Sequence, residues 1–143
     1  MDPGRITETL RTPIEACAWV RFAYLFGSMA RGAGRPGSDV DVGVYASPEP
    51  SALQLADLVG ALCRACGRDD VQVVVLNRRG PGFLKNVIQD GVLLVERDRE
   101  ERVIWQAQAM SEWYDFAPTF ALWRESFWDA RRKELHGGFG PGR

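Results

Sequence analysis

The chain has 143 residues, of which 45% are hydrophobic and 26% are charged, and its formal net charge is -1. This length and composition are typical of one globular domain with its own core. The near-neutral charge excludes a general basic surface for a nucleic-acid backbone, so we expect no direct contact with nucleic acid. No apolar run is long enough to span a membrane, and we expect no membrane partner.

The cysteine content and the N-terminal residues indicate a cytoplasmic protein. The three cysteines are an odd number, which suits a reducing compartment, and the first residues lack a signal-peptide pattern. Cys63 and Cys66 formally make a CxxC motif, but it lies in a helical pattern in a chain with a single histidine. We interpret both as small apolar residues of the core rather than as a zinc or redox site.

Two starts are compatible with the first helix. Residues 12–15 (TPIE) resemble a capping box with proline at the first helical position. Alternatively, a longer helix begins near Ile6 and is kinked at Pro13. The later elements are expected in this order: strand 21–26, helical turn 28–31, strand 39–45, helix 51–66, strand 71–76, helix 82–89, strand 92–95 and a helical region from about residue 99.

This order predicts an α/β fold with helices packed on a sheet. We expect one domain over residues 1–135, including a C-terminal helical region from about residue 98. Residues 136–143, rich in glycine, are expected to form a frayed tail.

The stretch from Tyr24 to Tyr45 carries the candidate site. Asp39 and Asp41 lie two residues apart on a predicted strand, so their side chains point to the same side. Two carboxylates this close repel each other unless a cation lies between them, and Mg²⁺ prefers oxygen ligands shared with phosphates. We therefore assign Asp39 and Asp41 as metal ligands and catalytic residues.

Gly27 and Ser28 end the preceding strand and open a predicted helical turn. Free backbone N–H groups at such a position suit a phosphate, and glycine permits a close approach of the backbone. We assign Gly27 and Ser28 to the nucleotide phosphates, with Arg31 as an additional positive group and Arg35 as a further candidate. The combined pattern predicts a metal–nucleotide site for phosphoryl or nucleotidyl transfer.

The spacing Gly27-Ser28, ten residues, then Asp39 and Asp41, in FGSMARGAGRPGSDVDVGVY, resembles the signature of the polymerase-β-like nucleotidyltransferases. It looks most like the minimal nucleotidyltransferases (MNT domains), and the similarity runs from RFAYLFGS through GVLLVERD. The resemblance implies a small mixed β-sheet flanked by helices, ATP as substrate with Mg²⁺, and transfer of a nucleotide to an acceptor hydroxyl.

Members of the MNT group are often antitoxins paired with a HEPN-domain ribonuclease toxin, and some adenylylate a tyrosine of that toxin. The resemblance therefore implies an antitoxin that transfers AMP from ATP to a protein hydroxyl. Two alternatives stay open. One is a catalytically weak or inactive module that masks its partner through a C-terminal aromatic surface. The other is a transferase for a small hydroxylated molecule such as an aminoglycoside.

The chain departs from the family pattern at the third carboxylate, which usually lies on a later strand in a pattern resembling VDVVDL. Residues 71–76 read VQVVVL, so Gln72 takes that position, and glutamine carries no charge and cannot act as a base. Asp70, two residues earlier, is a candidate replacement. Nucleotide binding is thus better supported by the sequence than catalysis.

A stripe of aromatic residues marks the C-terminal helical region. Pro118 interrupts this region, so we expect a kink or a new helix start near Phe116. Part of the stripe is expected to cover the sheet, and the rest is a candidate interface for a HEPN toxin or for a second copy of the chain. The stripe consists of Trp113, Phe116, Phe120, Trp123 and Phe127.

Overall fold

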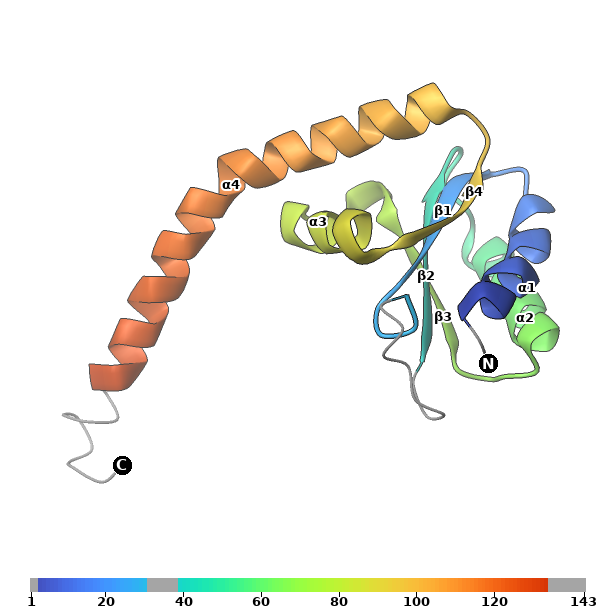
Figure 1. Cartoon of the computed structure of the whole chain (residues 1–143), viewed down its shortest axis with the longest axis horizontal. Helices are drawn as coiled ribbons and strands as arrows, with labels where there is room; N and C mark the ends of the chain where they lie inside the picture. Colours follow the sequence, from blue (N-terminus) through green and yellow to red (C-terminus); the bar gives the residue numbers. More distant parts are fainter. Residues whose placement is uncertain (1–2, 31–38, 134–143) are drawn as a thin grey trace.

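The computed structural model describes the backbone of residues 3–30 and 39–133 and the side chains of residues 4–30 and 39–118. Four strands form one mixed sheet in the order β3-β2-β1-β4 (Figure 1). β1 is antiparallel to both of its neighbours, whereas β2 and β3 are parallel. The strands are β1 (Val20–Phe26), β2 (Val40–Ala46), β3 (Val71–Val75) and β4 (Val92–Glu96). The small mixed sheet expected from the sequence is confirmed.

One face of the sheet is covered by α1 (Pro3–Glu15) and α2 (Ala52–Cys66), which lie side by side (Figure 1). The apolar residues of α1 recur every four residues and are fully buried, which fixes the face that this helix turns to the sheet. β2 contributes every second residue to the same core. The central members of this core are Ile6, Leu10, Ile14, Val40, Val42, Val44, Leu58 and Leu62.

The first helix follows the longer of the two expected courses. α1 begins at Pro3 and continues through Pro13, which lies inside the helix. The capping-box start at residues 12–15 is therefore wrong. Burial decides this, because Ile6, Leu10 and Ile14 form a single apolar stripe that needs one continuous helix to reach the core.

α2 matches its prediction. Ser51 caps its N-terminus through a capping box with Gln54, and Gly67 ends it in the left-handed conformation. Cys66 is buried and Cys63 half-buried in this helix, and both are free thiols. Their role as small core residues therefore agrees with their placement.

The opposite face carries α3 (Pro81–Asp90) and the first part of α4 (Arg99–Lys133), with the short 3₁₀ turn η1 (Leu76–Arg78) between β3 and α3. Aromatic side chains dominate this second core. Trp105 of α4 lies 5.0 Å from Phe22, which stacks on Tyr45 at 4.8 Å between ring centroids. β1 thus divides its side chains between the two cores, with Phe22 and Tyr24 on this face and Ala23 and Leu25 on the other.

α4 extends well past the sheet and bends along its length (Figure 1). Pro118 lies inside this helix, where it cannot donate a backbone hydrogen bond, so the helix bends instead of restarting. Trp113 is half-buried beside Phe116 and under Lys85 of α3, whereas Tyr114 and Phe116 are exposed. The side chains of Phe120, Trp123 and Phe127 lie outside the described residues.

Two further sequence predictions concern the C-terminal tail and the absence of a membrane span. The tail expected at 136–143 lies outside the described residues. Among the helices that are described, none combines the length and hydrophobicity needed to cross a membrane.

Candidate active site

The site is centred where β1 meets β2. Phe26, the last residue of β1, pairs with Asp41, and Gly27 follows with a left-handed φ of 77°. A Cβ added to Gly27 would lie 2.6 Å from Oδ2 of Asp41, which is closer than such atoms approach. Glycine is required here for two reasons, the backbone conformation and the carboxylate packed against it.

Asp41 is partly buried, and its surroundings destabilise its charge. Burial raises the pKa of Asp41, and the charge of Asp39 raises it further. Like charges held this close favour a bound cation, and hard divalent cations take carboxylate oxygens. Asp39 and Asp41 therefore offer a donor set that fits Mg²⁺. In the described part of the chain, no group of three or more His, Cys, Asp or Glu side chains is placed to hold a metal.

Gln72 of β3 lies opposite the acidic pair. It pairs with Asp41 in the parallel register, and its Nε2 donates a hydrogen bond of 3.2 Å to Oδ2 of Asp39. The position assigned to the third carboxylate thus faces the site, as the sequence indicated, and an amide occupies it. An amide can orient Asp39, but it neither adds charge nor accepts a proton from a substrate hydroxyl.

Asp70 lies beside this pair but is held by another residue. Its backbone oxygen accepts a hydrogen bond from the N–H of Val40 at 3.1 Å. Its carboxylate accepts two hydrogen bonds from Arg68, from Nε and from Nη2, both at 2.7 Å. This pairing lowers the pKa of Asp70. A carboxylate with a lowered pKa and both oxygens engaged is poorly suited to act as a general base.

Ser28 follows Gly27 in a turn that includes residues 28–30, and residue 31, the last of the expected helical turn, lies outside the described residues. Met29 is buried in the core between the sheet and the first two helices and anchors this turn. The turn keeps Ser28, which is half-buried, next to Gly27 at the margin of the site. Arg31 and Arg35 lie outside the described residues.

A cavity of about 340 Å³ opens beside Gly27, and the sequence motifs did not point to it. Most of its lining comes from α3, at spacings of three and four that place the residues on one helix face. This spacing can be recognised in the sequence. It indicates the cavity only once α3 is known to pack near β1. The lining consists of Phe26, Gly27, Phe83, Asn86, Val87 and Asp90.

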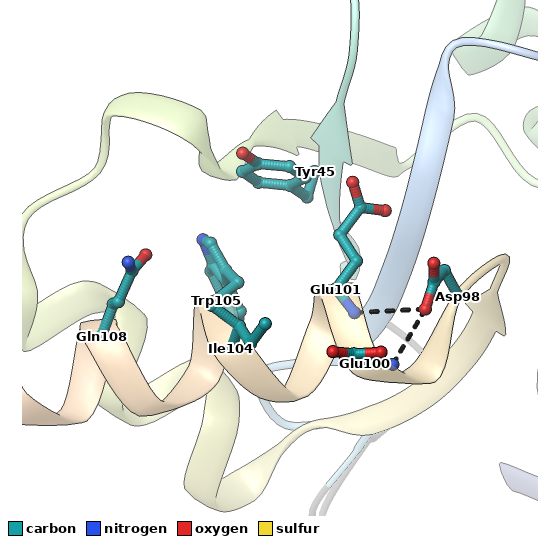
Figure 2. A pocket seen from close by; sticks show the side chains of 7 residues that line it. All are labelled: Tyr45, Asp98, Glu100, Glu101, Ile104, Trp105 and Gln108. Atoms are coloured by element: carbon teal, nitrogen blue, oxygen red, sulfur yellow. Dashed lines mark hydrogen bonds between the residues drawn. The ribbon is translucent and has the colours of Figure 1, made fainter.

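A second cavity, of about 390 Å³, lies at the other end of β2 (Figure 2). Tyr45 and Trp105 face it together with acidic side chains from the start of α4. Two of these acids have structural partners. Asp98 accepts hydrogen bonds from the N–H groups of Glu100 and Glu101, and Glu101 pairs with Arg21 at 2.8 Å. Asp39 and Asp41 lie at the opposite end of the strand, so this cavity is separate from the acidic pair.

Comparison with known proteins identifies the part of the chain that contains the site. A family model described as polymerase beta, nucleotidyltransferase, matches residues 8–100, which is well over half of the chain. This range contains both aspartates, the Gly-Ser pair and the cavity-lining residues of α3. The comparison with curated proteins gave no match.

Solved structures share the fold. One is a chain of a toxin–antitoxin complex with AMP-PNP, at 21% identity and a TM-score of 0.68, covering 89% of this chain and 99% of that chain. A second belongs to the complex of tri-AMPylated Shewanella oneidensis HEPN toxin with MNT antitoxin, at 20% identity and a TM-score of 0.62, covering 88% and 96%. A third belongs to the toxin–antitoxin MntA-HepT, at 20% identity and a TM-score of 0.61, covering 88% and 97%.

The family match, the four-stranded mixed sheet and the placement of Gly27 against Asp41 agree with one another. The chain therefore belongs to the polymerase β nucleotidyltransferase family.

Proposed function

We propose that the chain is a Mg²⁺-dependent nucleotidyltransferase that transfers AMP from ATP to a hydroxyl of a HEPN-type toxin and acts as its antitoxin. The observation that carries the proposal is the packing of the Asp41 carboxylate against Gly27, with Asp39 beside it. This arrangement brings a cation-binding pair next to a turn whose backbone can approach a phosphate.

Each part of the site has a role in this reaction. Asp39 and Asp41 hold Mg²⁺, which, when bound, neutralises the phosphate oxygens. Gly27 and Ser28 hold the terminal phosphates. The acceptor oxygen bonds to the α-phosphorus as the bond to the β-phosphate oxygen breaks, pyrophosphate leaves, and the hydroxyl proton passes to water. The protein contributes mainly positioning and charge neutralisation, as is usual for such transfers.

The partner is supported by the structures with the same fold. These structures are toxin–antitoxin complexes, one of them with a tri-AMPylated HEPN toxin, and the similarity covers nearly the full length of each matched chain. The exposed Tyr114 and Phe116 on the projecting helix α4 are available for such a contact. Their exposure supports our proposal that the partner interface lies on α4.

A second candidate function is a nucleotide-binding module that masks the toxin without modifying it. Gln72 favours this reading, because it places an amide where the reaction would gain from a carboxylate. Asp70 does not compensate, since Arg68 engages both of its carboxylate oxygens.

One experiment separates the two candidates. The chain is incubated with ATP, Mg²⁺ and a purified HEPN-type toxin, and the toxin is analysed by intact-mass spectrometry. The transferase predicts the addition of one or more AMP groups, abolished by Asp39→Asn and retained by Asp57→Asn, a matched change on the exposed surface of α2. Toxin inhibition without a mass change would support the masking module, and an absence of both effects would contradict the antitoxin proposal.

A further inference from the structure

The cavity beside Gly27 adjoins the acidic pair through Gly27 and Phe26. Gly27 lines the cavity and also packs against Oδ2 of Asp41. Phe26 lines the same cavity and pairs with Asp41 across the two strands. A molecule bound at the aspartates would therefore have the cavity as its neighbour on the same face of the sheet.

The cavity has an apolar wall and a polar edge. Phe26 and Phe83 meet edge to face, with ring centroids 5.5 Å apart, and Val87 is buried beside them. Asn86 and Asp90 lie on the same face of α3 and are exposed, so their polar groups are available to a ligand. A flat ligand with an apolar body and a hydrogen-bonding edge matches this lining.

The charge at the Asp90 end of the cavity disfavours a phosphate there and favours a hydrogen-bond donor. Asp90 is an acceptor, and it lies in the last turn of α3, where the backbone carbonyls add negative potential. Anionic groups are repelled from this end of a helix. The nucleoside end of a nucleoside triphosphate therefore suits this lining better than the phosphate end, and the aromatic wall favours the flat base over the ribose.

We propose that this cavity binds the base of the nucleotide and selects a base with an exocyclic amino group. The inference rests on the proposed function and extends it to the choice of nucleotide. Asp90 accepts a hydrogen bond from the amino group, and Asn86 pairs with the adjacent ring edge, since its amide both donates and accepts. Phe26, Phe83 and Val87 cover the apolar faces of the base. The volume of about 340 Å³ is within the range of small-ligand sites.

The test is calorimetric titration of Mg²⁺ complexes of ATP, GTP, CTP, UTP and inorganic tripolyphosphate into the full chain. We expect the three triphosphates with an amino group to bind roughly tenfold tighter than UTP, the size of effect that one charge-assisted hydrogen bond produces. UTP should in turn bind tighter than tripolyphosphate, because the apolar wall also covers the faces of uracil. Asp90→Ala should bring the affinities of ATP and UTP together while leaving that of tripolyphosphate unchanged.

Gln89→Ala provides the matched control, because Gln89 is exposed on the same helix and does not line the cavity. This variant should retain the preference of the wild type. Equal affinity for ATP and tripolyphosphate in the wild type would overturn the inference, as would an unchanged preference in Asp90→Ala. The inference would also be overturned if Asp90→Ala altered the rate of transfer to the acceptor without altering nucleotide affinity. If no phosphate compound binds, the proposed function fails together with the inference.

Discussion

The carboxylate of Asp41 occupies the space that a side chain at position 27 would need, since a Cβ at Gly27 would fall 2.6 Å from Oδ2 of Asp41. The Gly-Ser motif and the Asp-Val-Asp motif are therefore one structural unit, although ten residues separate them. The turn after β1 can approach a ligand at Asp41 only because residue 27 has no side chain.

Gly27→Ala should disrupt this unit in two ways. Alanine is strained at a φ of 77°, by about 1–2 kcal/mol, and its methyl group displaces the Asp41 carboxylate. We expect a lower free energy of unfolding in urea and a loss of Mg²⁺-dependent ATP binding. Gly67→Ala is the control, because Gly67 has a similar φ of 63° with no atom within 4 Å of the added Cβ. It should show the strain alone and retain ATP binding, and a loss of binding in both variants would contradict the account.

Asp41→Asn should make the protein more stable at neutral pH in the absence of divalent cations. The folded-state pKa of Asp41 is raised, first by burial and then by Asp39, so its ionised form destabilises the folded state above that pKa. As the pH falls through the raised pKa the folded protein takes up the proton, and the penalty disappears by the ordinary unfolded value of about 3.9. Urea unfolding in EDTA across this pH range should show a gain at pH 7 that shrinks toward pH 4.

The matched change for this experiment is Asp57→Asn on the exposed surface of α2, which should change stability by less than about 0.5 kcal/mol at every pH. A variant Asp41→Asn that is less stable than the wild type at pH 7 would mean that the carboxylate has a favourable partner in the folded state.

Gln72→Glu should increase the affinity of the site for Mg²⁺ and lower the stability of the metal-free protein. The new carboxylate lies within reach of Asp39, where Gln72 now donates its hydrogen bond, so it adds a ligand for a cation and repels Asp39 when no cation is bound. We expect tighter Mg²⁺ binding and AMP transfer faster by roughly 100-fold, the usual contribution of a general base. Single-turnover assays measure the rate of AMP transfer, with Gln89→Glu as a control on the surface. An unchanged rate despite tighter Mg²⁺ binding would exclude a general base at position 72.

Arg97→Ala should destabilise the fold without touching the site. The Arg97 guanidinium donates hydrogen bonds to the backbone oxygens of Glu15, Cys17 and Val20, at 2.7, 3.1 and 3.1 Å, and so ties the end of α1 to β4. We expect a loss of about 2 kcal/mol in the free energy of unfolding, because these carbonyls must then rely on water. Arg99→Ala should change stability by less than about 0.5 kcal/mol. An equal loss of stability in Arg97→Ala and Arg99→Ala would contradict a stabilising role for these hydrogen bonds.

The sequence predicted the elements that form the acidic pair and missed much of what surrounds it. Alternation at 39–45 predicted the face of Asp41, because strand periodicity does not depend on the tertiary context. The position of Gln72 opposite it was implied by the resemblance to the family pattern VDVVDL. The lining of the cavity could not be predicted, since it depends on how α3 packs against β1. The pairing of Asp70 with Arg68 was missed because it depends on the local course of the chain before β3.

Among the helices, too, local signals predicted some features and tertiary packing decided others. The end of α2 at Gly67 was predicted correctly from a local signal, whereas the start of α1 was ambiguous because a capping pattern at residues 12–15 competed with the apolar repeat of Ile6, Leu10 and Ile14. Burial of three side chains outweighs one cap in free energy, so the longer helix forms. The aromatic stripe was likewise divided by tertiary packing, with Trp113 half-buried beside Lys85 of α3 and Phe116 exposed.

The most direct test of the central claim is calorimetric titration of ATP into the protein, with and without Mg²⁺, beside the double variant Asp39→Asn/Asp41→Asn. The account predicts binding that requires Mg²⁺ in the wild type and is lost in the double variant. Binding of equal affinity in both proteins would contradict the assignment of Asp39 and Asp41 as the cation ligands, and no binding in the wild type would contradict a nucleotide site in the isolated chain.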